Sequence, residues 1–299
     1  MISTKPKHLG DHPVKKVAAV AVFAALVLAG CGVGEQDSAP SNPPTSGVES
    51  ESATPAPEEL QDYSFYFVTE TTQGFRLVRE VHQVSKTEND LGDDKGLNSL
   101  VMLVDGQLPP FDGDHRTLWN NGTKVNSVLN ANGLATVDLS LGRISLGSEA
   151  EIRAIDQIVW TLMENDPAIT SVQFTIDGKV SESIAGHVDL TQPFVKAPDY
   201  EVLATVWIDV LDRSDVQNPV SITGSACTFE ANVAWELTRA GDVVSSGATT
   251  AATACPDRSD WTIELGDLAP GSYVLTVSDF SPKDGSLIFQ DTKAFTVIN

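Results

Sequence analysis

The 299-residue sequence has few cysteines, few basic residues and no apolar run long enough to cross a bilayer as a helix. Three cysteines allow at most one intramolecular disulfide and exclude a zinc ribbon, which needs four ligands. Lysine and arginine together number 19 against 41 acidic residues, which gives a formal charge of −22. Nucleic-acid binding requires clustered cations, so we expect no nucleic-acid partner.

Motifs for catalysis are also lacking. Downstream of residue 31 the histidines are His82, His115 and His187, and none belongs to an H-E-x-x-H arrangement that would bind zinc. The segment around Ser145, from Gly142 to Gly147, has one residue too many for the G-x-S-x-G motif of a serine hydrolase. We therefore predict that the protein is not an enzyme and has no catalytic residues, cofactor or metal site.

One segment places a histidine close to carboxylates, Asp112-Gly-Asp114-His115. It could form a weak cation site or a solvated acidic loop, and we favour the solvated loop. The acidic segment that begins at Asp90 fails the EF-hand pattern, because Leu91 stands where the first ligand must be.

The N-terminus has the organisation of a secretory leader. Four lysines precede fourteen apolar residues from Val17 to Gly30, too few to span a bilayer as a helix. The segment ends in Leu28-Ala29-Gly30-Cys31, which resembles the lipobox of bacterial lipoproteins. That resemblance implies a signal peptide over 1–30 and a diacylglyceryl group, with palmitate among its acyl chains, on Cys31. The alternative is an ordinary secretory signal with an incidental cysteine.

Residues 31–61 are predicted to form a linker between the lipid-modified cysteine and the folded part of the chain. From Gly32 to Gln61 the sequence has five prolines and several acids but no aromatic, lysine or arginine residue. Such a composition buries too little apolar surface to offset chain entropy, so we predict a disordered acidic linker.

Residues 62–197 are predicted to form an α+β domain. Alternating apolar residues predict strands at 63–68 and 75–84, 124–129 and 134–139, and 172–176. Helical spacing appears at 97–104 and again at 152–162, where Ser148 and Glu151 are spaced as a capping box. We expect these helices to pack on one side of a mixed sheet. Trp119 is expected in a turn, half-buried or touching a ligand.

Several segments of this region resemble a GerMN domain, a family named after sporulation and germination proteins. They are 122–125, Gly133-Leu-Ala-Thr-Val-Asp-Leu-Ser140, the helix with Gln157-Ile-Val-Trp-Thr-Leu162, and 172–178. The resemblance implies a sheet-plus-helices fold and carries over no catalytic residues.

Residues 198–299 are predicted to be all-β. Seven strands are expected, at 202–210, 219–226, 230–239, 242–253, 259–265, 272–279 and 287–298. This number of strands favours a two-sheet sandwich. Tyr273, after Leu268-Ala-Pro-Gly-Ser, fits a tyrosine corner, but Leu275 replaces the antibody cysteine two residues later. Three tryptophans are expected in the sandwich core: Trp207, Trp235 and Trp261.

Segments 219–226 and 229–233, together with Gly271-Ser-Tyr273, resemble the immunoglobulin-like domain found beside GerMN in bacterial germination-type proteins. Cys227 and Cys255 are the thiols that remain after Cys31, and an exported protein meets oxidising conditions. We predict that they form a disulfide; the alternative is two buried free thiols.

Together these features predict an envelope protein held by lipid at the extracytoplasmic face of the cell membrane. It would act as a non-catalytic binding or scaffold module for protein or cell-wall partners. One alternative is an accessory of an envelope signalling system, because a related actinobacterial GerMN lipoprotein works beside a sensor kinase. The third hypothesis is an extracellular hydrolase, for which the sequence lacks a nucleophile–base pair.

Overall fold

A computed structural model of the chain describes residues 59–86, 92–119, 122–209 and 213–298. The predicted leader, Cys31, most of the predicted linker and Leu91 lie outside the described residues. All described residues belong to one compact unit, Pro55–Asn299. Within them no helix has both the length and the apolar character needed to cross a membrane.

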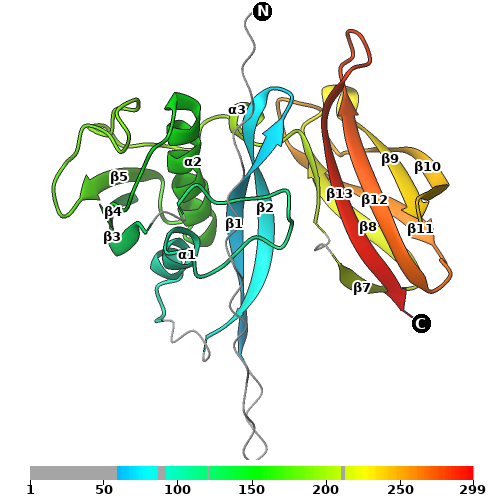
Figure 1. Cartoon of the computed structure of the whole chain (residues 1–299), viewed down its shortest axis with the longest axis horizontal. Coiled ribbons are helices and arrows are strands. Elements are labelled where there is room, and N and C mark those ends of the chain that lie inside the picture. Colours follow the sequence, from blue (N-terminus) through cyan, green and yellow to red (C-terminus); the bar gives the residue numbers. More distant parts are fainter. Residues whose placement is uncertain (1–58, 87–91, 120–121, 210–212, 299) are drawn as a thin grey trace, which may run out of the picture. The chain divides into compact units, whose positions relative to one another are not determined.

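The N-terminal half contains strands and helices in mixed order, followed by a short helical turn (Figure 1). In chain order they are β1 (Leu60–Thr71), β2 (Gly74–Ser85), α1 (Lys95–Val104), β3 (Lys124–Ala131), β4 (Leu134–Ser140), α2 (Ser148–Asn165), β5 (Ser171–Ile176) and α3 (Asp199–Val202). Each strand and helix predicted before residue 197 is present.

These elements form two sheets rather than one. The hairpin β1–β2 is a sheet of its own, and the second sheet has the order β3-β4-β5 with β4 and β5 parallel. Successive side chains of a strand point to opposite faces, and on one face of β1 Tyr63, Phe65 and Phe67 are completely buried. The apolar stripes of α1 and α2 complete this core.

The predicted capping box of α2 is wrong. Gly147 is the N-cap residue and makes no side-chain cap bond. The carboxylate of Glu151 is instead fully buried and accepts four hydrogen bonds from the loop that follows β5, from Ser183 Oγ (2.7 Å) and the backbone N–H groups of residues 184, 185 and 187. Burial raises the pKa of Glu151, but these hydrogen bonds outweigh it and lower the pKa. Sequence spacing cannot distinguish a cap from such a long-range contact.

The C-terminal half is a sandwich of two sheets. Its elements are β6 (Val206–Ile208), β7 (Ser214–Gln217), β8 (Val220–Ala226), η1 (Phe229–Ala231), β9 (Asn232–Arg239), β10 (Asp242–Thr250), β11 (Ser259–Gly266), β12 (Gly271–Phe280) and β13 (Leu287–Ile298). The sheet orders are β10-β9-β12-β13-β7 and β11-β8-β6. The sequence missed β7 and placed a strand at residue 202, where α3 ends.

Local features of the sandwich follow the sequence closely. The Tyr273 hydroxyl donates to the Ala269 carbonyl oxygen at 2.8 Å, as a tyrosine corner requires. A disulfide joins Cys227, just after β8, to Cys255, with the two Cα atoms 4.5 Å apart. Trp207 and Trp261 are buried in the core, whereas Trp235 is half-buried at its edge.

The two halves share apolar packing. Tyr66, Val68, Leu77 and Trp160 of the N-terminal half belong to the same core cluster as the sandwich interior. The Ala204 N–H donates to the Leu77 carbonyl oxygen at 2.8 Å, which extends main-chain hydrogen bonding from β2 to the start of the sandwich.

Candidate functional site: a cavity beside a buried polar cluster

One edge of β1 is covered by polar side chains of α2. Asn165 accepts from the Ser64 N–H (3.1 Å) and donates to the Ser64 carbonyl (2.7 Å). Two residues further along β1, the Tyr66 N–H donates to Thr161 Oγ1 (3.1 Å) and the Tyr66 carbonyl accepts from Gln157 Nε2 (3.0 Å). The helix thus satisfies main-chain groups that an edge strand would otherwise leave unpaired. Gln157 and Thr161 belong to the segment that carried the sequence resemblance.

The same edge continues towards the β1–β2 turn. Val68 exchanges two main-chain hydrogen bonds with Arg116, at 2.8 and 2.9 Å. By alternation the main chain of Glu70 is next on this edge. The Arg116 guanidinium pairs with the Glu70 carboxylate at 2.8 Å and lies over the ring of Phe75.

Beside this edge, Glu80 of β2 is the centre of a buried hydrogen-bond network. Glu80 is 6% exposed, and its carboxylate accepts from His115 Nδ1 (2.7 Å), His82 Nε2 (2.8 Å) and the Phe111 N–H (2.9 Å). Burial alone raises the pKa of Glu80, but these hydrogen bonds outweigh it and lower the pKa to about 2. Glu80 therefore remains ionised and fixes both imidazoles.

A second charge cluster joins the 111–116 loop to β13. The Lys293 ammonium contacts the Asp112 carboxylate and bonds Asp291 Oδ1 at 2.9 Å, while Asp291 Oδ2 accepts from the Ile208 N–H at 2.7 Å. All three charged side chains are buried. Burial alone would raise the pKa of Asp112 and lower that of Lys293. The hydrogen bonds and charge interactions of these groups outweigh burial, so the pKa of Asp112 is lowered and that of Lys293 is raised.

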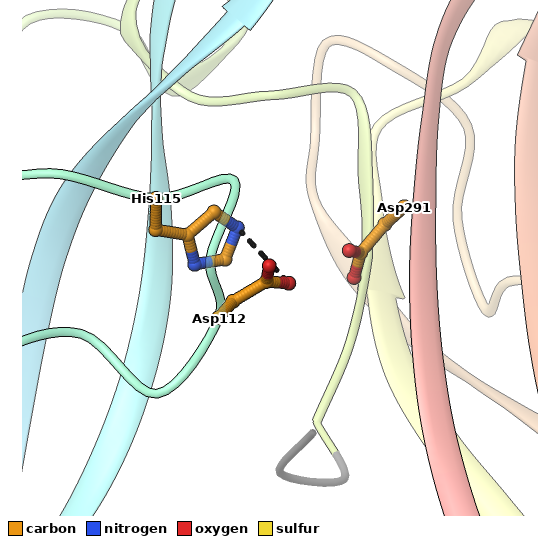
Figure 2. Close-up of side chains that lie close together, drawn as sticks. All are labelled: Asp112, His115 and Asp291. Atoms are coloured by element: carbon orange, nitrogen blue, oxygen red, sulfur yellow. Dashed lines mark ion pairs between the residues drawn. The ribbon is translucent and has the colours of Figure 1, made fainter. Parts of the chain in front are cut away.

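Figure 2 shows Asp112 and His115 on the loop and Asp291 on the facing strand. Their ligand atoms lie within 4.8 Å of one another, a spacing that could hold a metal ion. However, Lys293 already bonds both carboxylates, so the positive charge between them comes from the protein itself. A metal ion would have to displace this buried ammonium.

The predicted solvated loop at residues 112–115 is therefore wrong for two of its members. Asp112 and His115 are 7% and 5% exposed, and Asp114 alone of the three is exposed. Their partners Glu80, Asp291 and Lys293 come from strands far away in sequence. These partners occupy inward positions of their strands, between Val78 and Val84 or between Phe289 and Phe295. A charged residue at such a position indicates a buried ion pair, and this was the signal in the sequence that could have predicted them.

A cavity of about 630 Å³ opens beside these two clusters. Three segments line it: 69–72 at the end of β1, 113–116 in the loop, and 287–292 in β13. Threonines and a glutamine supply neutral hydrogen-bonding groups, while His115 and Asp291 connect the cavity to the buried charges. Its volume lies within the range of ligand pockets, but its lining is more polar than the largely apolar lining of small-molecule sites.

The β13 wall of the cavity is a strand edge. In its sheet β13 pairs with β12 along its length, but β7 covers only 295–298 on the other side (Figure 1). Beyond the reach of β7, Arg213 donates to the Ala294 carbonyl and Thr72 Oγ1 donates to the Ile288 carbonyl at 2.8 Å. Residues 288–292 of this stretch line the cavity.

The geometry of His115 does not fit a general base that activates a hydroxyl nucleophile. His115 uses Nδ1 for Glu80, and its Nε2 is 3.7 Å from Asp112 Oδ2. Both nitrogens thus face carboxylates rather than a hydroxyl that could act as a nucleophile. Ser145 is exposed in the loop before α2, and His187 is exposed in the loop after β5.

Trp119 does not reach this site, and the expectation of a half-buried or ligand-contacting side chain is wrong. The ring is fully buried in the N-terminal core, and its Nε1 donates to the Ala154 carbonyl oxygen at 2.8 Å. The indole therefore stabilises the position of α2.

Two families match consecutive parts of the chain. Residues 64–182 match the family described as "Germane: Sporulation and spore germination". Residues 211–286 match "Gmad2: Immunoglobulin-like domain of bacterial spore germination". The chain carries a Germane (GerMN-like) domain followed by a Gmad2 domain. This confirms both resemblances seen in the sequence and the predicted α+β fold with an immunoglobulin-like sandwich.

No curated protein matches the chain. Among solved structures, the tandem GerMN domains of the sporulation protein GerM from Bacillus subtilis are 20% identical, with 48% of this chain and 50% of that chain covered and a TM-score of 0.37. The first GerMN domain of GerM is also 20% identical, with 46% and 98% covered and a TM-score of 0.37. A putative lipoprotein from Clostridium perfringens is 21% identical, with 50% and 99% covered and a TM-score of 0.32. The present chain thus spans half the length of the tandem GerM structure.

The cavity lies where the Germane and Gmad2 domains meet. Its loop and β1 walls belong to the Germane domain, and its β13 wall continues the Gmad2 sandwich beyond the matched residues. Neither domain alone would form it.

Proposed function

We propose that this protein is a non-catalytic binding module of the cell envelope, held at the extracytoplasmic face of the membrane by lipid on Cys31. The cavity between the Germane and Gmad2 domains carries this proposal. It is lined by hydrogen-bonding groups and main-chain edges, while the neighbouring histidines and carboxylates are held in mutual hydrogen bonds and ion pairs.

The partners proposed are proteins or cell-wall components. Both family descriptions refer to spore germination, which supports an accessory role rather than catalysis. The net charge of −22 argues against attachment to an anionic membrane by charge, so the proposal assigns attachment to the acyl chains.

Two measurements test this function. Cys31→Ala should abolish incorporation of radiolabelled palmitate and move the protein out of the membrane fraction, whereas Cys31→Ala protein that sediments with membranes like wild type would contradict lipid anchoring. Tagged wild-type protein, solubilised from membranes, should retain a reproducible partner or co-sediment with purified cell wall. If the protein retains no partner and does not co-sediment with cell wall, the binding role is contradicted.

A further inference from the structure

The edge of β13 between Ile288 and Ala294 presents main-chain groups to the cavity. In the continuous β12–β13 register, Ala294, Thr292 and Gln290 oppose Val274, Thr276 and Ser278. Residues of an antiparallel strand alternate in the side to which their N–H and C=O groups point. The Ala294 carbonyl accepts from Arg213, outside the β12 pairing, so the groups of Thr292 and Gln290 point the same way.

In the part of the chain that the structure describes, hydrogen bonds cap the two ends of this stretch and none reaches the outward main-chain groups of its middle. Thr72 Oγ1 donates a hydrogen bond to the Ile288 carbonyl, and the Arg213 N–H donates one to the Ala294 carbonyl. Among the described residues β7 begins its pairing only at Phe295, so it does not reach Gln290 or Thr292. Two donors and two acceptors, spaced about 7 Å apart in pairs, thus face the cavity. This spacing matches the backbone of one added strand.

We propose that this edge binds an extended, positively charged peptide segment of a partner protein by strand addition, a mode that rests on the binding role proposed above. The observations that identify the occupant are the strand-spaced main-chain groups and the charge of their surroundings. Arg116 is neutralised by Glu70, which leaves the exposed carboxylate of Asp114 at the cavity wall, and the whole chain carries −22. A second copy of the chain would be repelled by the same charge.

Fluorescence anisotropy on the full-length protein in detergent micelles tests this directly. The probe is a fluorescein-labelled peptide of sequence Lys-Val-Thr-Val-Lys-Val-Thr, compared with its Glu-for-Lys counterpart and with a version N-methylated at alternate residues. We expect the cationic peptide to bind and both counterparts to bind at least tenfold more weakly, because one lacks the charge and the other lacks main-chain donors.

Gln290→Pro removes the edge N–H without touching a β12 hydrogen bond, and proline is tolerated at such edge positions. It should weaken binding of the cationic peptide at least tenfold, whereas the matched control Gln290→Thr, which keeps the N–H, should bind like wild type. If Gln290→Pro does not fold, as judged by circular dichroism, the N-methylated peptide provides the same comparison on wild-type protein.

Three results would overturn the proposal: binding that ignores N-methylation, binding that survives Gln290→Pro in folded protein, or self-association that Gln290→Pro abolishes. Absence of peptide binding, while a partner is still retained from solubilised membranes, would overturn strand addition and leave the binding role intact. Absence of both peptide binding and a retained partner would contradict the proposed function itself.

Discussion

Replacement of Glu80 by glutamine should reveal how strongly the buried network around this carboxylate stabilises the folded protein. In the folded protein the pKa of Glu80 is about 2, against an ordinary value of 4.5. Each unit of difference corresponds to about 1.4 kcal/mol, so ionised Glu80 contributes on the order of 3 kcal/mol to the free energy of unfolding.

The sign of the pH dependence follows from the lowered pKa. A carboxylate whose folded pKa is depressed stabilises fully above its unfolded pKa and loses this contribution as the pH falls through its folded pKa. Wild type should therefore lose the Glu80 contribution between about pH 4.5 and pH 2. Glu80→Gln should lack it throughout, because a neutral amide does not titrate and its NH₂ group cannot accept from the Phe111 N–H.

Urea denaturation at pH 7, 5, 4 and 3, followed by tryptophan fluorescence, measures the difference. We expect Glu80→Gln to be less stable by about 3 kcal/mol at pH 7 and the gap to narrow steadily below pH 4.5. The other acids titrate in both proteins and cancel in this difference. Parallel stability curves for the two proteins would refute the assignment of a strongly stabilised carboxylate at residue 80.

Three further changes test other parts of the structure. Lys293→Met should destabilise by about 3–5 kcal/mol in urea denaturation, because two buried carboxylates lose their cation, and adding Asp291→Asn should recover part of the loss; additive effects would argue against the pairing. Gly224→Ala should lower the melting temperature sharply in calorimetry, since a Cβ there overlaps a main-chain oxygen and a tryptophan ring, and an unchanged melting temperature would contradict that packing. For Cys227 and Cys255, alkylation should label both residues only with reductant, as measured by mass spectrometry of their peptides, and Cys→Ser at both should cost about 3.5 kcal/mol for a loop of 28 residues; labelling of either residue without reductant would contradict the disulfide.

Local pattern was enough to predict most of the elements. Alternation in Tyr63–Val68 and the helical spacing from Ile152 to Leu162 depend on residues at most four positions apart, and both elements are present where expected. Tyr273 also finds its acceptor only four residues away. Interactions of this range are encoded in short segments and can be read directly.

The candidate site could not be predicted in this way, because its parts come from distant segments. Glu80 meets His115 across 35 positions, and Lys293 meets Asp112 across 181. β7 is four residues long and lacks a run of apolar side chains, so no pattern marks it. Without β7 the extent of the open edge on β13 cannot be deduced.

Site-specific photocrosslinking in living cells tests the central claim that partners bind in the cavity between the two domains. Benzoylphenylalanine would replace Thr292, which lines the cavity, and in a matched control Val243, which is exposed on β10 away from the cavity lining. We predict a discrete higher-mass adduct for the probe at residue 292 and none at residue 243. No adduct at 292, or the same adducts at both positions, would contradict the account.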